Sequence, residues 1–95
     1  MNTRTEILDT AKGLINGPRQ DTYGTPSQSF AAIAQMWSAY LGFTIEPYDV
    51  SMMMVLLKAA RFRQSPHKAD HVVDICGYAA LTGEIAEEMD DGQAD

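Results

Sequence analysis

Helix-breaking residues divide this chain into four apolar, helix-favouring segments, and this division constrains the fold more than any other feature. Gly17-Pro18 ends the first segment, Pro47 suits the first turn of the third, and residues 64–66 (Gln-Ser-Pro) end the third. No segment shows sustained period-two alternation, so strands are not required. Four helices with short connections predict an all-α, four-helix bundle-like fold.

The four helices are expected over residues 4–16, about 27–42, 47–63, and from the 67–78 segment to about residue 85. Thr3 and Glu6 fit a capping box at the first helix, and Ser27 or Ser29 can cap the second. The apolar side chains expected to face inward from the first two helices are Ile7, Leu8, Ala11, Leu14, Ile15, Phe30, Ile33, Ala34, Trp37, Tyr40 and Leu41.

The third segment contains six consecutive apolar residues at positions 52–57. A helix that is apolar around most of its circumference is usually buried on several sides. A domain of 95 residues has few elements with which to bury it. We therefore predict that another copy of the chain covers part of this helix, which makes the protein oligomeric. Methionines that fill gaps in the core are the alternative explanation.

Charge is unevenly distributed along the chain, although the net charge is −6. Residues 84–95 hold six acids and no base, whereas the remainder holds seven acids and seven bases. We expect a single helical domain over residues 1–86, followed by an acidic flexible tail over 87–95. The sequence contains no stripe of basic residues of the kind that binds duplex nucleic acid, so we expect no duplex nucleic-acid partner.

The cellular compartment is predicted from the single cysteine and from the apolar runs. Cys76 alone cannot form an internal disulfide, which suits a reducing cytoplasm. The first residues lack the apolar stretch of a signal peptide, and the run 52–57 is too short to span a bilayer. We expect a protein of the cytoplasm that does not bind membranes.

Two carboxylates and two imidazoles lie close together at the start of the fourth helix. Asp70 and Asp74 share a face because they are four residues apart, and His67 and His71 form a neighbouring row. Like charges at this spacing repel each other, so a compensating cation or solvent is expected. Mg²⁺ is one candidate; surface acids, with Asp70 favoured near the helix N-terminus, are the alternative.

The same residues allow two further interpretations. The aspartates can pair with Lys58 or Arg61 across a helix interface. The histidines can ligate zinc with an aspartate as third ligand, although a single His–Asp hydrogen bond or a solvent-exposed histidine is the commoner arrangement.

Lys58 and Arg61 share a face of the third helix because they are three residues apart. They can bind phosphate, with Arg61 as a planar fork and Lys58 as a point charge. Alternatively, Lys58 lays its stem along apolar surface and Arg61 interacts with the helix C-terminus. Tyr23-Gly24, in the polar loop 19–26, is either a platform for a base beside a phosphate or a packing tyrosine before a glycine at positive φ.

The order of these motifs resembles a family of small, all-helical, mostly phage-encoded domains of the nucleotide-modification-associated type. The shared pattern is a basic residue before Tyr-Gly, Ser-Phe at a helix start, Lys-x-x-Arg, and an acidic pair leading into Asp-Ile-x-Gly-Tyr-Ala. Over about residues 19–86, the residues that carry it are Arg19, Tyr23, Gly24, Ser29, Phe30, Lys58, Arg61, Asp70, Asp74, Ile75, Gly77, Tyr78 and Ala79. More distantly, the chain resembles the MazG-like all-α nucleoside triphosphate pyrophosphohydrolases.

The MazG-like resemblance implies an oligomer that binds nucleotide phosphates through Mg²⁺ and hydrolyses the α–β bond. Asp70 and Asp74 would then hold Mg²⁺. The nucleotide-binding residues would be Arg19, Tyr23, Gly24, Lys58 and Arg61. Those enzymes use acidic motifs on two helices, whereas the acidic pair occurs once here. A neighbouring copy, or Asp9, Asp21 or Asp49, would have to complete a catalytic site.

Two alternatives to an enzyme remain open. One is a non-catalytic protein that sequesters a nucleotide signal, which would suit a phage acting against host defence. The other is an interaction module whose methionine-rich third helix docks a protein partner.

Overall fold

The computed structural model describes residues 3–17 and 24–93, and within these residues every regular element is a helix. The helices are α1 (Arg4–Ile15), α3 (Pro26–Leu41), α4 (Pro47–Gln64) and α5 (Ala69–Gln93). The predicted all-α class with four helices is therefore confirmed for the described residues, whereas the oligomeric state stays a prediction. None of the described helices is both long enough and apolar enough to cross a membrane.

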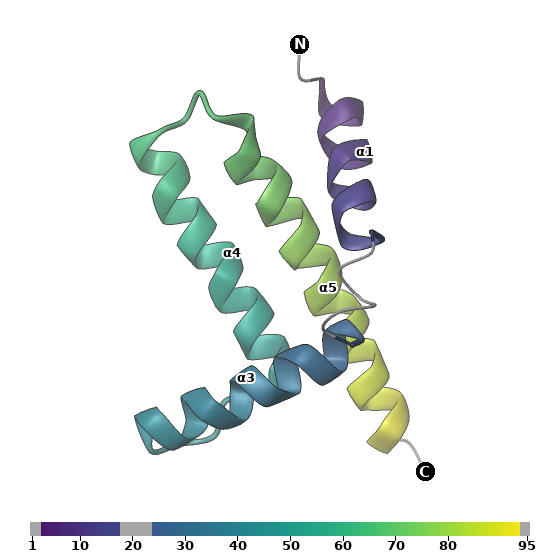
Figure 1. The fold of residues 1–95 in the computed structure, drawn as a ribbon, viewed down its shortest axis with the longest axis vertical. Helices are drawn as coiled ribbons and strands as arrows, with labels where there is room; N and C mark the ends of the chain where they lie inside the picture. The colour runs from purple at the N-terminus through teal and green to yellow at the C-terminus, as the bar shows by residue number, and fades with distance from the viewer. Residues whose placement is uncertain (1–2, 18–23, 94–95) are drawn as a thin grey trace.

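An antiparallel hairpin of α4 and α5 forms the centre of the molecule (Figure 1). Helix α1 lies along the first part of α5, and α3 crosses the other end of the hairpin, where it contacts α4 and α5. Because α3 runs across the hairpin rather than along it, the arrangement is a hairpin with two flanking helices. The principal extents are 45 × 27 × 27 Å.

A capping box starts α1 as predicted. The Glu6 backbone N–H donates to Thr3 Oγ1 at 3.2 Å, and the Thr3 backbone N–H donates to Glu6 Oε1 at 2.9 Å. The hydrogen bond from the Thr3 backbone N–H to the Glu6 carboxylate, followed by the interaction of this carboxylate with the Thr3 side chain, lowers the pKa of Glu6. Two donors that have no partner inside the helix are thereby satisfied.

Helix α3 begins earlier than predicted. Its cap is Thr25, which exchanges hydrogen bonds of 3.2 and 3.0 Å with Gln28, so the prediction of a Ser27 or Ser29 cap is wrong. Pro26 occupies the first turn. The Thr-Pro pair supplies both a capping hydroxyl and a preset helical φ, so the helix starts there rather than at the serines.

Helix α5 continues to Gln93, so the prediction that it ends near Ile85 is wrong. The residues after Ile85 are mostly good helix formers, and no glycine or proline interrupts them before Gly92. The Ser27 hydroxyl also donates to the Glu88 carboxylate, which ties this extension to α3. The division into a domain over 1–86 and a flexible tail over 87–95 stays a prediction.

The buried core is small. Its hydrophobic members come from all four helices and are Ala11, Ala34, Val50, Val73 and Ile85. Ser51 is fully buried beside them. The Thr82 hydroxyl donates to Ser51 Oγ at 2.6 Å, and the Ser51 hydroxyl donates to the Tyr48 carbonyl at 3.1 Å. A satisfied polar contact therefore joins α4 to α5 inside the core.

Several apolar residues predicted to face inward are exposed instead. Leu8 is 57% exposed, Tyr40 is 89% exposed, and Leu14 and Leu41 are also exposed. Helix α1 packs chiefly against α5, so only a narrow stripe of it is covered. Helix α3 crosses the hairpin with part of its length (Figure 1), and its last residues, 39–41, are exposed.

Candidate functional site

The candidate site lies between α4 and α5, and we call Lys58, Arg61, Asp70 and Asp74 the polar seam. Its centre is an ion pair in which Lys58 Nζ lies 2.9 Å from Asp74 Oδ2. The two side chains are 16% and 31% exposed, so the pair is partly shielded from water. Of the alternatives left open by the sequence, pairing across the helix interface is the one that the structure contains for Asp74.

Arg61 and Asp70 lie at one end of this ion pair. Arg61 is one turn later on α4, and Asp70 is one turn earlier on α5, so the antiparallel hairpin places both on the side of its connecting turn. Both side chains are exposed. Among the side chains that the structure describes, those of residues 3–17 and 24–90, the Lys58–Asp74 contact is the single ion pair. Arg61 is exposed, so its guanidinium is accessible to solvent.

The described side chains form no cluster of the size that protein metal sites commonly use. In the part of the chain that the structure describes, no three His, Cys, Asp or Glu side chains are grouped so that they could hold an ion. Asp49, one candidate for completing a catalytic site, lies at the first turn of α4, where its carboxylate accepts from the Glu46 backbone N–H at 2.9 Å. Asp21, another candidate, lies outside the described residues.

The structure describes both histidines and, from the polar loop, the residues from Gly24 onward. His67 is exposed and His71 is half-buried. Arg19 and Tyr23 lie outside the described residues, so their assignment to the nucleotide site stays a prediction. Gly24 has φ +82°, as one of the two interpretations of this loop predicts. A Cβ there would lie 2.7 Å from Gln28 Oε1, the oxygen that accepts from the Thr25 backbone N–H.

Replacing Gly24 with alanine should lower the free energy of unfolding by about 1–2 kcal/mol, because an L side chain is strained at this left-handed φ. The new methyl group would also displace the Gln28 side chain from the capping box. Gly42→Ala is the matched control, since Gly42 has the same φ but nothing within 4 Å of an added Cβ. Urea denaturation should show the greater loss at Gly24, and equal losses would contradict a role for the Gln28 contact.

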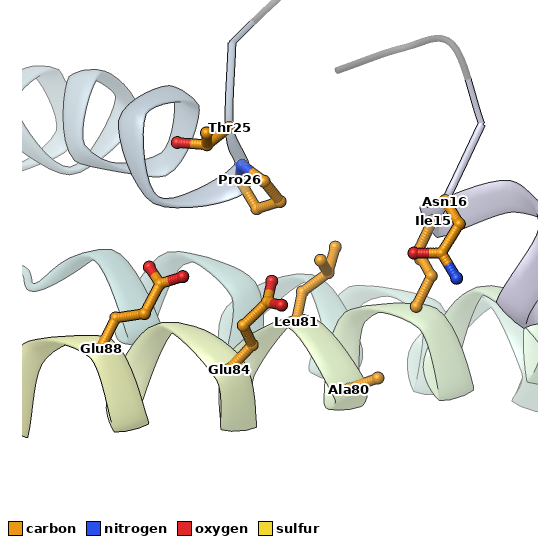
Figure 2. Close-up of a pocket in the computed structure, with 8 residues that line it drawn as sticks. All are labelled: Ile15, Asn16, Thr25, Pro26, Ala80, Leu81, Glu84 and Glu88. Carbon is orange, nitrogen blue, oxygen red and sulfur yellow. The ribbon is translucent and has the colours of Figure 1, made fainter.

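Sequence reasoning missed a cavity of about 230 Å³ where the end of α1 and the start of α3 face α5 (Figure 2). Glu84 and Glu88 project from α5 toward Thr25 and Pro26, and Asn16 lines the other side. The one sequence signal that could have indicated this cavity is the four-residue spacing of Glu84 and Glu88. Composition alone, however, assigns both glutamates to the acidic, solvated C-terminal segment. Their negative charge disfavours phosphate, so the cavity is a poorer nucleotide site than the polar seam.

Comparison with known proteins gives a family and its phage context. Residues 6–86 match the family described as "Domain of unknown function (DUF6378)". The chain is similar to the Gene 55 protein of Mycobacterium phage L5, with 46% identity over 76 residues that cover 79% of this chain and 49% of that protein. It is similar to the Gene 55 protein of Mycobacterium phage D29, with 38% identity over 87 residues that cover 92% and 58%, respectively.

The family match, over residues 6–86, includes the whole polar seam. The chain spans about half the length of the curated relatives it matches. No solved structure matches it. The resemblance to phage-encoded domains is thus confirmed, whereas the more distant relationship to MazG-like enzymes stays a prediction.

Proposed function

We propose that this phage protein, which belongs to the DUF6378 family, binds a nucleotide or another phosphate-bearing small molecule at the polar seam. The observation that carries the proposal is the pairing of Lys58 with Asp74 at 2.9 Å beside the solvent-facing Arg61. One cation is held in place by an acid, and the other is exposed one turn away on the same helix. This arrangement presents two positive groups to one ligand.

The donors of the two cations suit a phosphate. An ammonium group has three donors, so Lys58 keeps two after it donates to Asp74. Arg61 offers five donors in a planar fork that matches two phosphate oxygens. Because one helical turn rises about 5.4 Å, the two groups can reach one phosphate or two adjacent phosphates. A di- or triphosphate therefore fits better than an uncharged base.

A magnesium ion could arrive with the ligand. Mg²⁺ commonly uses one or two protein carboxylates and takes its remaining ligands from phosphates and water. Asp70 and the Asp74 oxygen not paired with Lys58 are the candidates for this role. Multi-metal hydrolysis needs more carboxylates than these two supply, and no larger ligand group occurs among the described side chains of residues 3–17 and 24–90. We therefore propose sequestration of the ligand, without turnover, as the activity of this chain.

A panel of nucleotides and pyrophosphate, each with and without Mg²⁺, tests this proposal by thermal shift. A ligand at 100 times its Kd should stabilise the folded state by about 2.7 kcal/mol. Arg61→Ala should weaken binding at least tenfold, because a charge-assisted hydrogen bond contributes about 1.5–3 kcal/mol. Lys12→Ala is the matched control, since Lys12 is an exposed cation on α1.

Three outcomes would count against the proposal. If no phosphate compound raises the melting temperature, the seam is not a phosphate site. If Arg61→Ala and Lys12→Ala bind equally well, the ligand binds elsewhere. Release of pyrophosphate during incubation would replace sequestration with hydrolysis.

A further inference from the structure

An exposed apolar face runs along α4 on the side away from α5. Met52, Met53, Leu56 and Leu57 are all exposed, and Leu56 is 63% exposed. Helix α4 contacts α5 along its length and α3 near its start, which leaves this side free (Figure 1). Four large apolar side chains within two turns are too many to be scattered surface residues.

The exposed area of the chain is larger than a monomer of its size requires. It exposes 6932 Å² at a mass of 10.4 kDa. A folded monomer of that mass is expected to expose about 5,400 Å². The difference, about 1,500 Å², exceeds the roughly 800 Å² per chain that a standard protein interface buries. The area available is thus sufficient for a stable dimer.

We propose that α4 of a second copy covers this face in a two-fold symmetric, antiparallel dimer with Leu56 at the axis. The charges of α4 favour this occupant. Its first turn is acidic with Asp49, and its last turn is basic with Arg61 and Arg63. Asp49 and Arg63 each lie seven residues from Leu56, so all three share one face of the helix. Antiparallel packing about Leu56 places Asp49 of each copy opposite Arg63 of the other, whereas parallel packing would bring like charges together.

Side-chain size supports the same alignment. With Leu56 at the axis, Met52 and Met53 of one copy face Ala59 and Ala60 of the other. Large side chains therefore meet small ones, which allows two helices to interdigitate. The interface is isologous, because every contact occurs twice about the axis.

The proposed dimer face and the Lys58–Asp74 ion pair lie on opposite sides of α4. Lys58 is two residues from Leu56 and thus points to the opposite side of α4, so the dimer leaves the polar seam open. Loss of the dimer and loss of ligand binding are therefore separable.

Light scattering coupled to gel filtration tests the dimer. At micromolar concentration the full chain should have twice the monomer mass of 10.4 kDa. Leu56→Arg should give the monomer mass, because it places two cations against each other at the axis. Leu8→Arg is the matched control, since Leu8 is similarly exposed but lies on α1, and it should remain dimeric. Arg63→Glu should raise the dimer Kd at least tenfold through repulsion by Asp49 of the other copy.

Covalent cross-linking keeps the test valid if Leu56→Arg fails to fold. In a Cys76→Ser background, Leu56→Cys should form dimers with a short bismaleimide, because a residue at the axis faces its own counterpart. Leu8→Cys should form few. A monomer mass for the unaltered chain, or equal cross-linking of the two cysteine variants, would overturn the dimer. An unchanged Kd for Arg63→Glu would overturn the antiparallel alignment.

Discussion

Replacing Ile85 with alanine is expected to lower the free energy of unfolding by about 3 kcal/mol, the middle of the range for truncating a large buried aliphatic side chain. Ile85 is completely buried, and it is one of five buried hydrophobic residues in the described part of the chain. The other four buried hydrophobic residues are alanines and valines, which are too small to fill the cavity that the substitution leaves. Because small domains are stable by only about 5–15 kcal/mol, the loss should be a large fraction of the total.

Chemical denaturation at one fixed protein concentration measures this effect, since dimerisation would make the apparent stability depend on concentration. Ile85→Val should lose about 1 kcal/mol, which provides a graded comparison. Leu8→Ala is the exposed control and should change the unfolding free energy by no more than about 1 kcal/mol. A loss at Ile85 no larger than that at Leu8 would show that the core does not lie where the structure places it.

The second large effect is expected from Gly77→Leu, which should lower the free energy of unfolding by about 2–3 kcal/mol through overpacking. Gly77 is buried in α5, and a Cβ added there would lie only 3.1 Å from Ile15 Cγ2 of α1. A leucine must therefore push α1 away from α5. Because α5 is the main contact of α1, the whole of α1 should loosen.

Gly83→Leu is the matched control, because Gly83 lies on the same helix with nothing within 4 Å of an added Cβ. It should stabilise the protein by up to about 1 kcal/mol through the higher helix propensity of leucine. Hydrogen exchange should show faster exchange of the α1 amides in Gly77→Leu only, while the amides of the α4–α5 hairpin stay protected. Equal exchange of α1 in both variants would contradict the close approach of the two helices.

Local signals in the sequence are sufficient for the class of fold and for most helix boundaries. The Thr3–Glu6 capping box and Pro47 predict two helix starts correctly, because the groups involved lie within four residues of one another. The same reasoning fails at Thr25, where a second capping box competes with two serines that are equally good caps. It also fails at the end of α5, since high acidity indicates solvation and does not by itself end a helix.

The sequence predicts which residues of the polar seam share a helix face, but it does not predict their contacts between helices. The four-residue spacing places Asp70 with Asp74 on one face, and the three-residue spacing places Lys58 with Arg61 on another. Which members would meet depends on the register of α4 against α5, and no local signal determines that register. The hairpin brings Lys58 to Asp74 and leaves Arg61 in solvent. The cavity beside Glu84 and Glu88 was not predictable, because three helices contribute to it.

The sequence by itself determined the four helices found in residues 3–17 and 24–93, because capping, proline placement and helical periodicity act over a few residues. Only the tertiary structure decided which apolar faces are covered. Helix α3 crosses the hairpin instead of lying along it, so Tyr40 and Leu56 are exposed although both occupy apolar stretches. Helical periodicity predicts which face of a helix is apolar and must be covered. The angle at which the helices pack decides whether that face is covered by the same chain or by another one.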